Sequence, residues 1–328
     1  MQSRKFCGIL WRMKVLIHFW GVRGSLPTPL KNAQVQAKIA AVVSRISPKD
    51  LESSESKMKF LSSLPEWIYG TIGGNTPCIE LRSKSDELFL LDCGTGLREF
   101  SVAGRQPENG HYNIFLSHFH WDHIQGFPFF GQSFSPNSKI DIYTPFADAE
   151  EYLERQSSLP YFPINACFES VKNQLSFHLM QEGNPIEIGG LKIECHRMFH
   201  PGDSYSYSFE EDGKRFIYST DVELQTSDFD KECARNKFFE NADVLVFDSQ
   251  YTNPEAAKKV NWGHNSFSSA IDFASNWNIK NLYFFHHEPN YDDKKLDSIL
   301  DAGNNYKKYK SNGNLNLYIS KEGQEIQL

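Results

Sequence analysis

One short stretch, LSHFHWDHIQG at residues 116–126, constrains the possible folds of this chain more than any other part of the sequence. It places three histidines and one aspartate within six residues, although the whole chain of 328 residues contains only 11 histidines. A strand that ends just before the motif would present His118 and His120 on one face, because side chains alternate along a strand. Asp122 and His123 follow where the chain turns toward a helix. Imidazole nitrogens and carboxylate oxygens bind zinc, manganese or iron, so this stretch predicts a metal site.

The overall composition is that of a globular protein with enough apolar residues for a large core. Hydrophobic residues make up 40% of the chain and aromatic residues 14%. There are 34 Lys and Arg residues against 41 Asp and Glu residues, so the formal net charge is −7. That balance argues against a protein that mainly wraps a polyanion, and nucleic acid is not expected as its partner. No apolar run is long enough to span a membrane, so no membrane segment is expected.

The cysteines and the N-terminus favour a single cytoplasmic domain. None of the cysteines forms a CxxC pair, so neither a zinc ribbon nor a dithiol redox centre is indicated, and reduced thiols are expected. Arg12 and Lys14 interrupt the apolar stretches near the N-terminus, and no small-residue cleavage site follows. We therefore predict an N-terminal extension at residues 1–12 and one hydrolase domain at residues 13–328, with Met1 or Met13 as the native start. The six cysteines are Cys7, Cys78, Cys93, Cys167, Cys195 and Cys233.

Most of the chain consists of short strand-like runs separated by turn residues. They fall into two groups, each followed by helical periodicity, which predicts two β-sheets packed face to face with helices outside. Strands are expected at residues 14–20, 77–83, 87–94, 112–118, 139–145, 191–199, 204–211, 214–221, 242–251, 281–287 and 315–320. Helices are expected at residues 148–156, 266–277 and 294–308. Residues 31–63 break this pattern and predict two inserted helices, which would form a lid, a dimer surface or a packing elaboration.

Further metal-ligand residue types follow three of the later predicted strands. His200 precedes Pro-Gly, Asp221 ends RFIYSTD, and His286 follows NLYFF. Functional side chains collect where strands give way to loops. A catalytic zinc site usually keeps three protein ligands and one open position, so seven ligands are enough for two metals. We expect two divalent ions per chain, with Zn²⁺ favoured and Mn²⁺ as the alternative.

The order HxHxDH, His200, Asp221, His286 resembles the metallo-β-lactamase-fold hydrolases over nearly the whole chain after Lys14. This resemblance implies an αββα four-layer sandwich with a helical insertion at about 31–63. Asp92 in LLDCGTG matches the aspartate that supports the ligand loop in these proteins. The resemblance implies that the first metal is held by His118, His120 and His200, the second by Asp122, His123 and His286, and that Asp221 bridges the two. For the final ligand it favours His286 over the adjacent His287.

Other segments resemble the phosphodiesterase branch of these hydrolases. His120 occupies a position where the redox di-iron members carry a carboxylate, which favours hydrolysis. WGHNSFSSAIDFA places His264 after a glycine at the start of a helix and resembles a motif of RNase Z and its phosphodiesterase relatives. In those proteins the motif histidine donates a proton or stabilises charge at the phosphate; Asn265-Ser266 here departs mildly from their Ser-Thr. FWGVRGSLPTP, GGNTPCIEL and FFHHEPNYDD resemble a bacterial branch near the cyclic-nucleotide phosphodiesterases. We therefore predict catalytic roles for His264 and Asp122.

Residues around the ligands complete the predicted site. Glu223 and Asp248 are predicted to orient histidines. Arg23 and Asn75, in loops near the motif, are predicted to contact the substrate phosphate. Aromatic side chains suited to stacking on a base are abundant, and whether they line a pocket or fill the core stays open from the sequence. These aromatic residues are Phe119, Trp121, Phe127, Phe129, Phe130, Tyr161, Phe162 and Trp262.

The expected function is therefore a dinuclear metal-dependent phosphodiesterase acting on small diesters, foremost 3′,5′-cyclic nucleotides. Two metals would neutralise the phosphate and hold a bridging hydroxide for attack, with His264 assisting the leaving group. Because no basic insertion is placed like the tRNA-gripping arm of RNase Z, a small diester is favoured over tRNA. Three alternatives stay open: an RNase Z-like endoribonuclease, an ester, thioester or lactam hydrolase, and a non-enzymatic binding module. A homodimer is expected from the resemblance alone.

Overall fold

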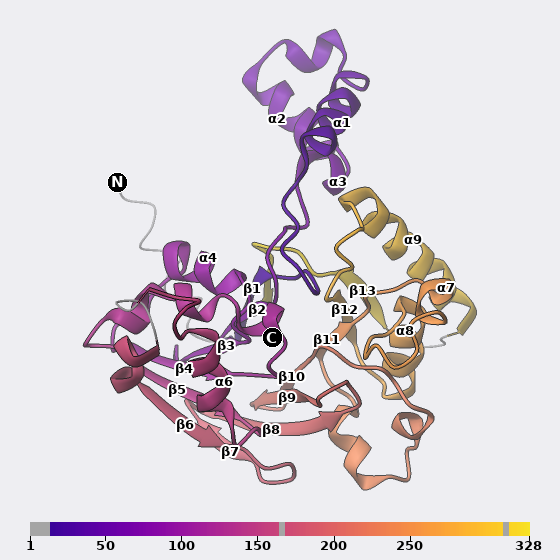
Figure 1. The fold of residues 1–328 in the computed structure, drawn as a ribbon. Helices are drawn as coiled ribbons and strands as arrows, with labels where there is room; N and C mark the ends of the chain where they lie inside the picture. The colour runs from indigo at the N-terminus through magenta and orange to yellow at the C-terminus, as the bar shows by residue number, and fades with distance from the viewer. Residues whose placement is uncertain (1–13, 164–167, 311–314) are drawn as a thin grey trace.

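The computed structural model describes residues 14–163, 168–310 and 315–328. In these residues two seven-stranded sheets lie face to face, and helices cover their outer faces (Figure 1). The fold is therefore the αββα four-layer sandwich that the sequence predicts. Among the described residues, none of the helices combines the length and the apolar character needed to cross a bilayer.

The first sheet has the strand order β14-β1-β2-β3-β4-β5-β6. Strands β3 to β6 run parallel, so the loops that follow β3 and β4 meet at one edge of the sheet. Helix α4 (Gly96–Ala103) packs Leu97 and Phe100 against the outer face of this sheet. The strands are β1 (Leu16–Gly21), β2 (Cys78–Arg82), β3 (Leu88–Leu91), β4 (His111–Phe115), β5 (Lys139–Thr144), β6 (Leu175–Leu179) and β14 (Glu325–Gln327).

The second sheet has the strand order β13-β12-β11-β10-β9-β8-β7. Strands β10 to β13 are parallel, so their carboxyl ends also share one edge. Helices α8 (Phe267–Asn276) and α9 (Asp293–Lys310) cover its outer face. The strands are β7 (Ile186–Ile188), β8 (Leu191–Met198), β9 (Ser204–Glu211), β10 (Lys214–Ser219), β11 (Val244–Asp248), β12 (Asn281–Phe285) and β13 (Asn316–Ile319).

The two sheets bury a continuous apolar core between them. Phe19 and Phe89 of the first sheet and Phe209 and Tyr218 of the second belong to this core. Because the opposite face of each sheet is covered by helices, central strands such as β2 and β3 are buried at every residue. This explains why β3, LFLL, is a continuous apolar run. In β2 the polar residues Glu80 and Arg82 are also buried, and their side chains pair with each other.

The predicted helical insertion forms an arm that projects from the sandwich (Figure 1). We call residues 31–69 the arm. Thr28 N donates a hydrogen bond to Gly74 O at 2.7 Å, so the segments entering and leaving the arm lie side by side. Neither of its two main helices buries any residue. The arm contains α1 (Asn32–Val43), the 3-10 turn η2 (Pro48–Leu51), α2 (Ser54–Ser63) and α3 (Glu66–Tyr69).

Several sequence expectations differ from the structure in detail. The strand predicted at 242–251 is only Val244–Asp248, because the chain after it leaves the sheet to carry functional side chains. The helix at Gly96–Ala103 and strands β6, β7 and β14 were not predicted. The predicted extension at residues 1–12, Cys7 and Cys167 lie outside the described residues. The described cysteines are free thiols, namely Cys78, Cys93, Cys195 and Cys233.

Candidate metal centre

The HxHxDH segment connects β4 to the short helix α5 (Trp121–Ile124). His120 occupies the extended N-cap position, and Asp122 and His123 lie in the single turn that follows. His118, Asp122 and His123 are buried, whereas His120 is exposed. One loop of the first sheet therefore delivers four possible ligands to the edge of the sandwich.

The second sheet delivers three more ligands to the same edge. His200 follows β8, Asp221 follows β10 and His286 follows β12 directly. Asp221 and His286 adopt left-handed backbone conformations, with φ of 53° and 60°. Such conformations are costly for residues other than glycine and cluster at functional sites, where they turn a side chain in a required direction.

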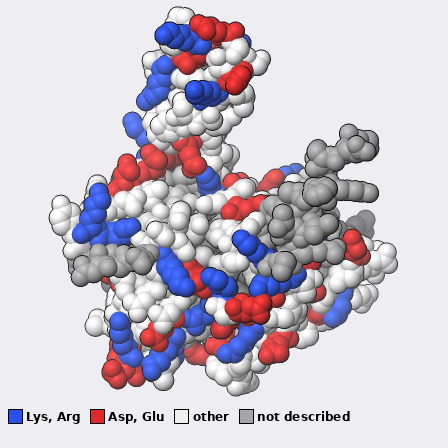
Figure 2. All heavy atoms as spheres, turned by 180° about the vertical axis from the view of Figure 1, so that it is seen from behind, with Lys and Arg blue, Asp and Glu red and all other residues white. Residues whose placement is uncertain are grey.

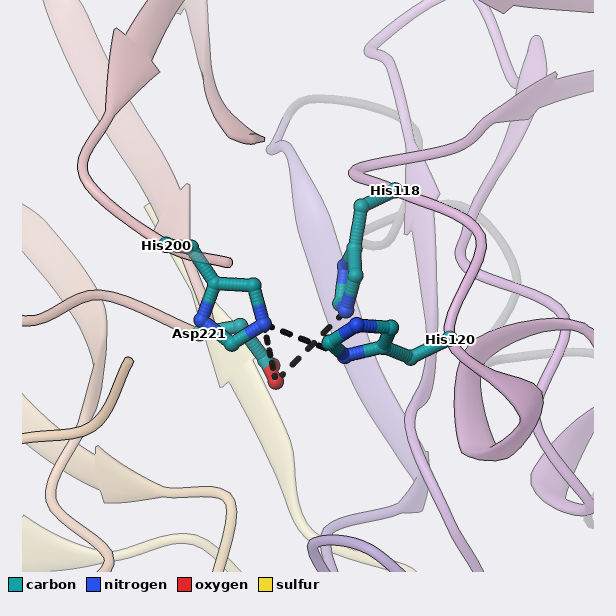
Figure 3. Close-up of side chains that lie close together, drawn as sticks. All are labelled: His118, His120, His200 and Asp221. Carbon is teal, nitrogen blue, oxygen red and sulfur yellow. Dashed lines mark hydrogen bonds and ion pairs between the residues drawn. The ribbon is translucent and has the colours of Figure 1, made fainter. Parts of the chain in front are cut away.

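The first ligand group comprises His118, His120, His200 and Asp221 (Figure 3). Their ligand atoms lie within 4.8 Å of one another. His200 Nε2 is 3.1 Å from His120 Nδ1. Asp221 Oδ1 is 3.6 Å from His118 Nε2 and 3.8 Å from His200 Nε2. One oxygen of Asp221 therefore faces the imidazoles of His118 and His200.

The second ligand group comprises Asp122, His123 and His286. His286 Nε2 is 3.1 Å from Asp122 Oδ2. The other oxygen of Asp221, Oδ2, is 3.0 Å from His123 Nε2 and 3.3 Å from His286 Nε2. Asp221 thus lies between the two groups with one oxygen toward each, which is the arrangement that two bridged metals require.

The chemistry of these side chains fits two divalent cations. The Nε2 atom of His118 is buried without a hydrogen-bond partner, which is rare for a buried polar atom and would be relieved by a cation. Burial lowers the pKa of His118 well below its usual value and that of His200 to about 4, so both imidazoles are in the neutral, metal-binding form. Burial alone would raise the pKa of Asp221, but His123 and His286 outweigh burial and hold it well below its usual value.

Asp92 follows β3 and is hydrogen-bonded to the ligand loop, which agrees with the role that the resemblance implies for it. It is fully buried, and its Oδ2 accepts hydrogen bonds from His123 Nδ1 at 2.7 Å, Ser117 Oγ at 2.7 Å and Tyr218 OH at 2.6 Å. Its Oδ1 accepts a bond from Ser117 N at 2.7 Å. Fixing the proton on Nδ1 of His123 directs Nε2 toward the metal position. Ser117 and Tyr218 were not predicted as part of this support.

His264 lies beside the ligands and is held by Asp248. Its Nδ1 is 2.7 Å from Asp248 Oδ2 and 3.9 Å from Asp221 Oδ1, and its ring stacks on His286 with centroids 4.9 Å apart. Burial would lower the pKa of His264, but the carboxylates of Asp248, Asp221 and Asp122 together outweigh burial and raise it. Asp248 therefore orients His264. The Nδ1 atom of His286 lies 3.2 Å from Gln250 Oε1, which is closer than the 3.8 Å to Asp248 Oδ2. Gln250 was not predicted as part of the site.

Glu223 acts on a ligand histidine only through a loop. Its carboxylate accepts hydrogen bonds from Asn261 N at 2.8 Å and Gly263 N at 2.9 Å. Gly263 O in turn lies 2.9 Å from His200 Nδ1, which donates to it. Gly263 has a φ of 86°, and a Cβ added there would lie 2.0 Å from His200 Nδ1. Only glycine fits this position.

The structure does not bring Arg23 and Asn75 to the ligands as phosphate contacts. Arg23 is buried, and its Nε and Nη1 donate to Gly73 O and Tyr291 O, each at 2.8 Å. Asn75 Nδ2 donates to Glu322 Oε2 at 3.2 Å. These hydrogen bonds satisfy polar groups of Arg23 and Asn75 and link neighbouring loops. They give no support to the prediction that the two side chains contact the substrate phosphate.

His286, not its neighbour, reaches the metal ligands. His287 points elsewhere, and its Nε2 lies 2.8 Å from Ser320 O, to which it donates. Burial lowers the pKa of His287 to about 3, so it is neutral and needs no countercharge. The geometry agrees with the choice of His286 as the final ligand.

A two-sheet sandwich with histidines and aspartates converging at one edge defines a metal-dependent hydrolase with the metallo-β-lactamase fold. A family model described as the β-lactamase superfamily domain matches residues 88–287, so the chain belongs to this superfamily.

Individual relatives are more distant. A ribonuclease Z from Oceanobacillus iheyensis is 23% identical over 270 residues, covering 68% of this chain and 86% of the relative. The solved structure of the metallo-β-lactamase fold protein YhfI from Bacillus subtilis aligns with a TM-score of 0.62 and 18% identity, covering 96% of this chain and 100% of that one. Unliganded yeast PDE1 aligns with a TM-score of 0.63 and 14% identity, again over 96% and 100%. At these identities the solved structures support the fold alone.

Proposed function

We propose that the protein is a dinuclear metal-dependent phosphodiesterase that hydrolyses small phosphodiesters, foremost 3′,5′-cyclic nucleotides. The observation that carries this proposal is the position of Asp221, with one oxygen toward each ligand group, next to His264, which lies close enough to Asp221 and His286 to act at the same centre. When bound, two divalent ions, with Zn²⁺ favoured over Mn²⁺, would neutralise the anionic diester and lower the pKa of water.

The residues of the chain have distinct roles in this proposal. His264 Nδ1 donates a hydrogen bond to Asp248 and keeps its proton. In this proposal Nε2 is therefore the atom that gives a proton to the leaving alkoxide. Asp248 holds the ring in that tautomer and stabilises its charged form. Asp122, whose Oδ2 accepts a hydrogen bond from Ser25 N at 2.7 Å, is both a ligand and the carboxylate that orients the attacking water.

The test is a panel of substrates assayed with zinc and with manganese. We expect the metal-loaded protein to cleave one or more of cAMP, cGMP, cCMP and cUMP. His264→Ala should lower kcat by roughly 10²–10⁴-fold with the metal content unchanged. His18→Ala, at a histidine that stacks on Trp20 and pairs with Glu325, is the control. Intact cyclic nucleotides beside cleavage of another diester would contradict the substrate, and full activity of His264→Ala would favour an ester or thioester hydrolase.

An RNase Z-like endoribonuclease is the second candidate. The ribonuclease Z relative favours it and weakens the expectation that nucleic acid is not a partner. Against it, the arm carries basic and acidic side chains together, as Figure 2 shows from behind, with no uniformly basic surface on that face. Cleavage of a structured RNA at enzyme concentrations that leave cyclic nucleotides intact would decide for the nuclease. The predicted homodimer can be tested in the same preparation by light scattering.

A further inference from the structure

A large aromatic cavity lies beside the ligand loop. Its volume is about 740 Å³, within the range of small-molecule sites. Its walls come from the ligand loop and α5, from the turn at residues 128–129, from helix α6 (Ala149–Gln156) and from residues 161–162. Six aromatic side chains line it, namely Phe119, Trp121, Phe129, Tyr152, Tyr161 and Phe162.

Three of these aromatic side chains are largely exposed and line the cavity without belonging to the core. Trp121 is 81% exposed, Phe129 59% and Tyr161 76%. Soluble proteins seldom leave several large apolar side chains exposed around one hollow unless they bind something there. By contrast, the neighbouring Phe127 and Phe130 are buried and belong to the core under the first sheet. The structure therefore separates the aromatic residues that the sequence left undecided.

Phe119 forms a firm base for this cavity. Its ring packs edge-on against Phe146 and Tyr152, with centroids 5.4 Å and 5.0 Å apart. Phe129 and Phe162 form a similar pair at 5.6 Å. Edge-to-face packing of this kind holds aromatic rings in place. A planar ligand would thus meet a fixed aromatic surface and lose little free energy in ordering it.

The cavity borders the segment that carries the first four ligands. His120 is the only exposed member of the first ligand group, so the centre opens to solvent at that residue. Phe119 and Trp121, the residues directly before and after His120, both line the cavity. Ile124 and Gln125 line it as well, one and two residues after the ligand His123. The ligand groups and the cavity wall thus share one short stretch of chain, residues 118–125.

We infer that this cavity binds a planar aromatic group of the substrate, which in a nucleotide is the base. The inference rests on the proposed phosphodiesterase function and adds where the base lies and what holds it. Stacking on aromatic side chains tolerates every base, because every base has a π face. The one cationic side chain lining the cavity, Arg155, is paired with Glu151 on the same helix, so the cavity wall is close to neutral and suits a base better than a second phosphate.

The test compares two ligands that differ only in the aromatic group. Binding of AMP and of ribose 5-phosphate to the zinc-loaded protein is measured by calorimetry, and hydrolysis of bis(p-nitrophenyl) phosphate is measured in the same preparation. We expect AMP to bind about tenfold more tightly than ribose 5-phosphate. Trp121→Ala should abolish this preference and leave the ribose 5-phosphate affinity and the zinc content unchanged, while Trp121→Phe should retain most of it.

Two further variants keep the test decisive. Tyr161→Ala lies in the cavity but outside the ligand loop, so it should weaken AMP binding without any route through the metals. Trp262 is 60% exposed and precedes Gly263, outside the cavity. If Trp262→Ala, and not Trp121→Ala, removes the preference for AMP, the inference is wrong. Equal binding of AMP and ribose 5-phosphate by a protein that hydrolyses the diester overturns the cavity assignment alone. Absence of diester hydrolysis overturns the proposed function.

Discussion

The carboxylate of Asp221 shows how much of the site depends on one side chain. Its backbone is left-handed just after β10, and each of its two oxygens lies near one imidazole from each sheet. A longer side chain or a different backbone angle would move both oxygens together. The two ligand groups are therefore not independent, and a change in one is expected to alter metal binding at the other.

The pairing of His264 with Asp248 leads to a kinetic prediction. Asp248→Asn removes the charge that holds the imidazole in its tautomer, so kcat should fall while the metal content stays constant. Because the two residues act as one unit, Asp248→Asn combined with His264→Ala should be no slower than His264→Ala alone. Additive losses in the double variant would mean that Asp248 acts through another group.

The bonds to Asp92 lead to a prediction on metal affinity. Asp92→Asn should weaken metal binding by roughly 10–100-fold, because His123 loses the acceptor that directs its ring. Competition with a chelator measures this loss. Tyr218→Phe removes one donor to the same oxygen and leaves the bond to His123, so it should have a much smaller effect. Equal effects of the two variants would contradict the orienting role.

In the loop at residues 261–264, Gly263 leaves the space that the imidazole of His200 occupies. Gly263→Ala should displace His200 and lower metal occupancy, because the added Cβ would lie 2.0 Å from Nδ1 of that ring. Gly202→Ala is a matched control: its φ is 85° and a Cβ there meets nothing within 4 Å. It carries the same backbone strain next to the same histidine. Metal analysis should show a loss of metal in Gly263→Ala and none in Gly202→Ala. Equal loss in both variants would mean that backbone strain, and not the contact with His200, causes the effect.

The arm forms a separable element. Its main helices bury no residues, and the chain enters and leaves it at adjacent positions. Its links to the sandwich include the ion pair between Lys38 Nζ and Asp293 Oδ2 at 2.6 Å. We expect a variant that replaces residues 31–69 by a short Gly-Ser linker to keep its fold, metal content and small-diester activity. A loss of RNA cleavage alone would assign the arm to a nucleic acid, and loss of folding would contradict its independence.

The sequence predicted those features that depend on short-range patterns of apolar and polar residues. Ligands at strand ends, the helical insertion and the two-sheet order follow from periodicity and motif spacing. Strands β7 and β14 were not predicted because each has only three residues, too few to show an alternation of apolar and polar side chains. Gln250 and Tyr218 were missed for another reason, because their roles depend on contacts between residues far apart in the sequence: Tyr218 bonds to Asp92 of the other sheet, and Gln250 lies against His286 at the end of the neighbouring strand. A loop arginine near a motif suggests a phosphate contact, but the buried guanidinium of Arg23 donates to carbonyl oxygens, so its bonds give that prediction no support.

For the whole molecule, the decisive feature is that the ligands come from both sheets. The loop after β4 belongs to the first sheet, and His200, Asp221 and His286 follow strands of the second. Metal ions that bind only the folded arrangement stabilise it by mass action. We expect each ion at a hundred times its Kd to raise Tm by about 4 °C. Differential scanning calorimetry with and without chelator measures the shift, and an unchanged Tm in protein shown to bind metal would contradict it.

Because the two sheets meet at the metal centre, metal supply should also govern how long the chain survives in a cell. Chain that has lost its ions opens more often at that edge and exposes strand ends to proteases. Newly made chains that fail to load metal would be degraded first, so the population that persists would be enriched in loaded enzyme. Protein abundance, and not only activity, would then follow the availability of the ions.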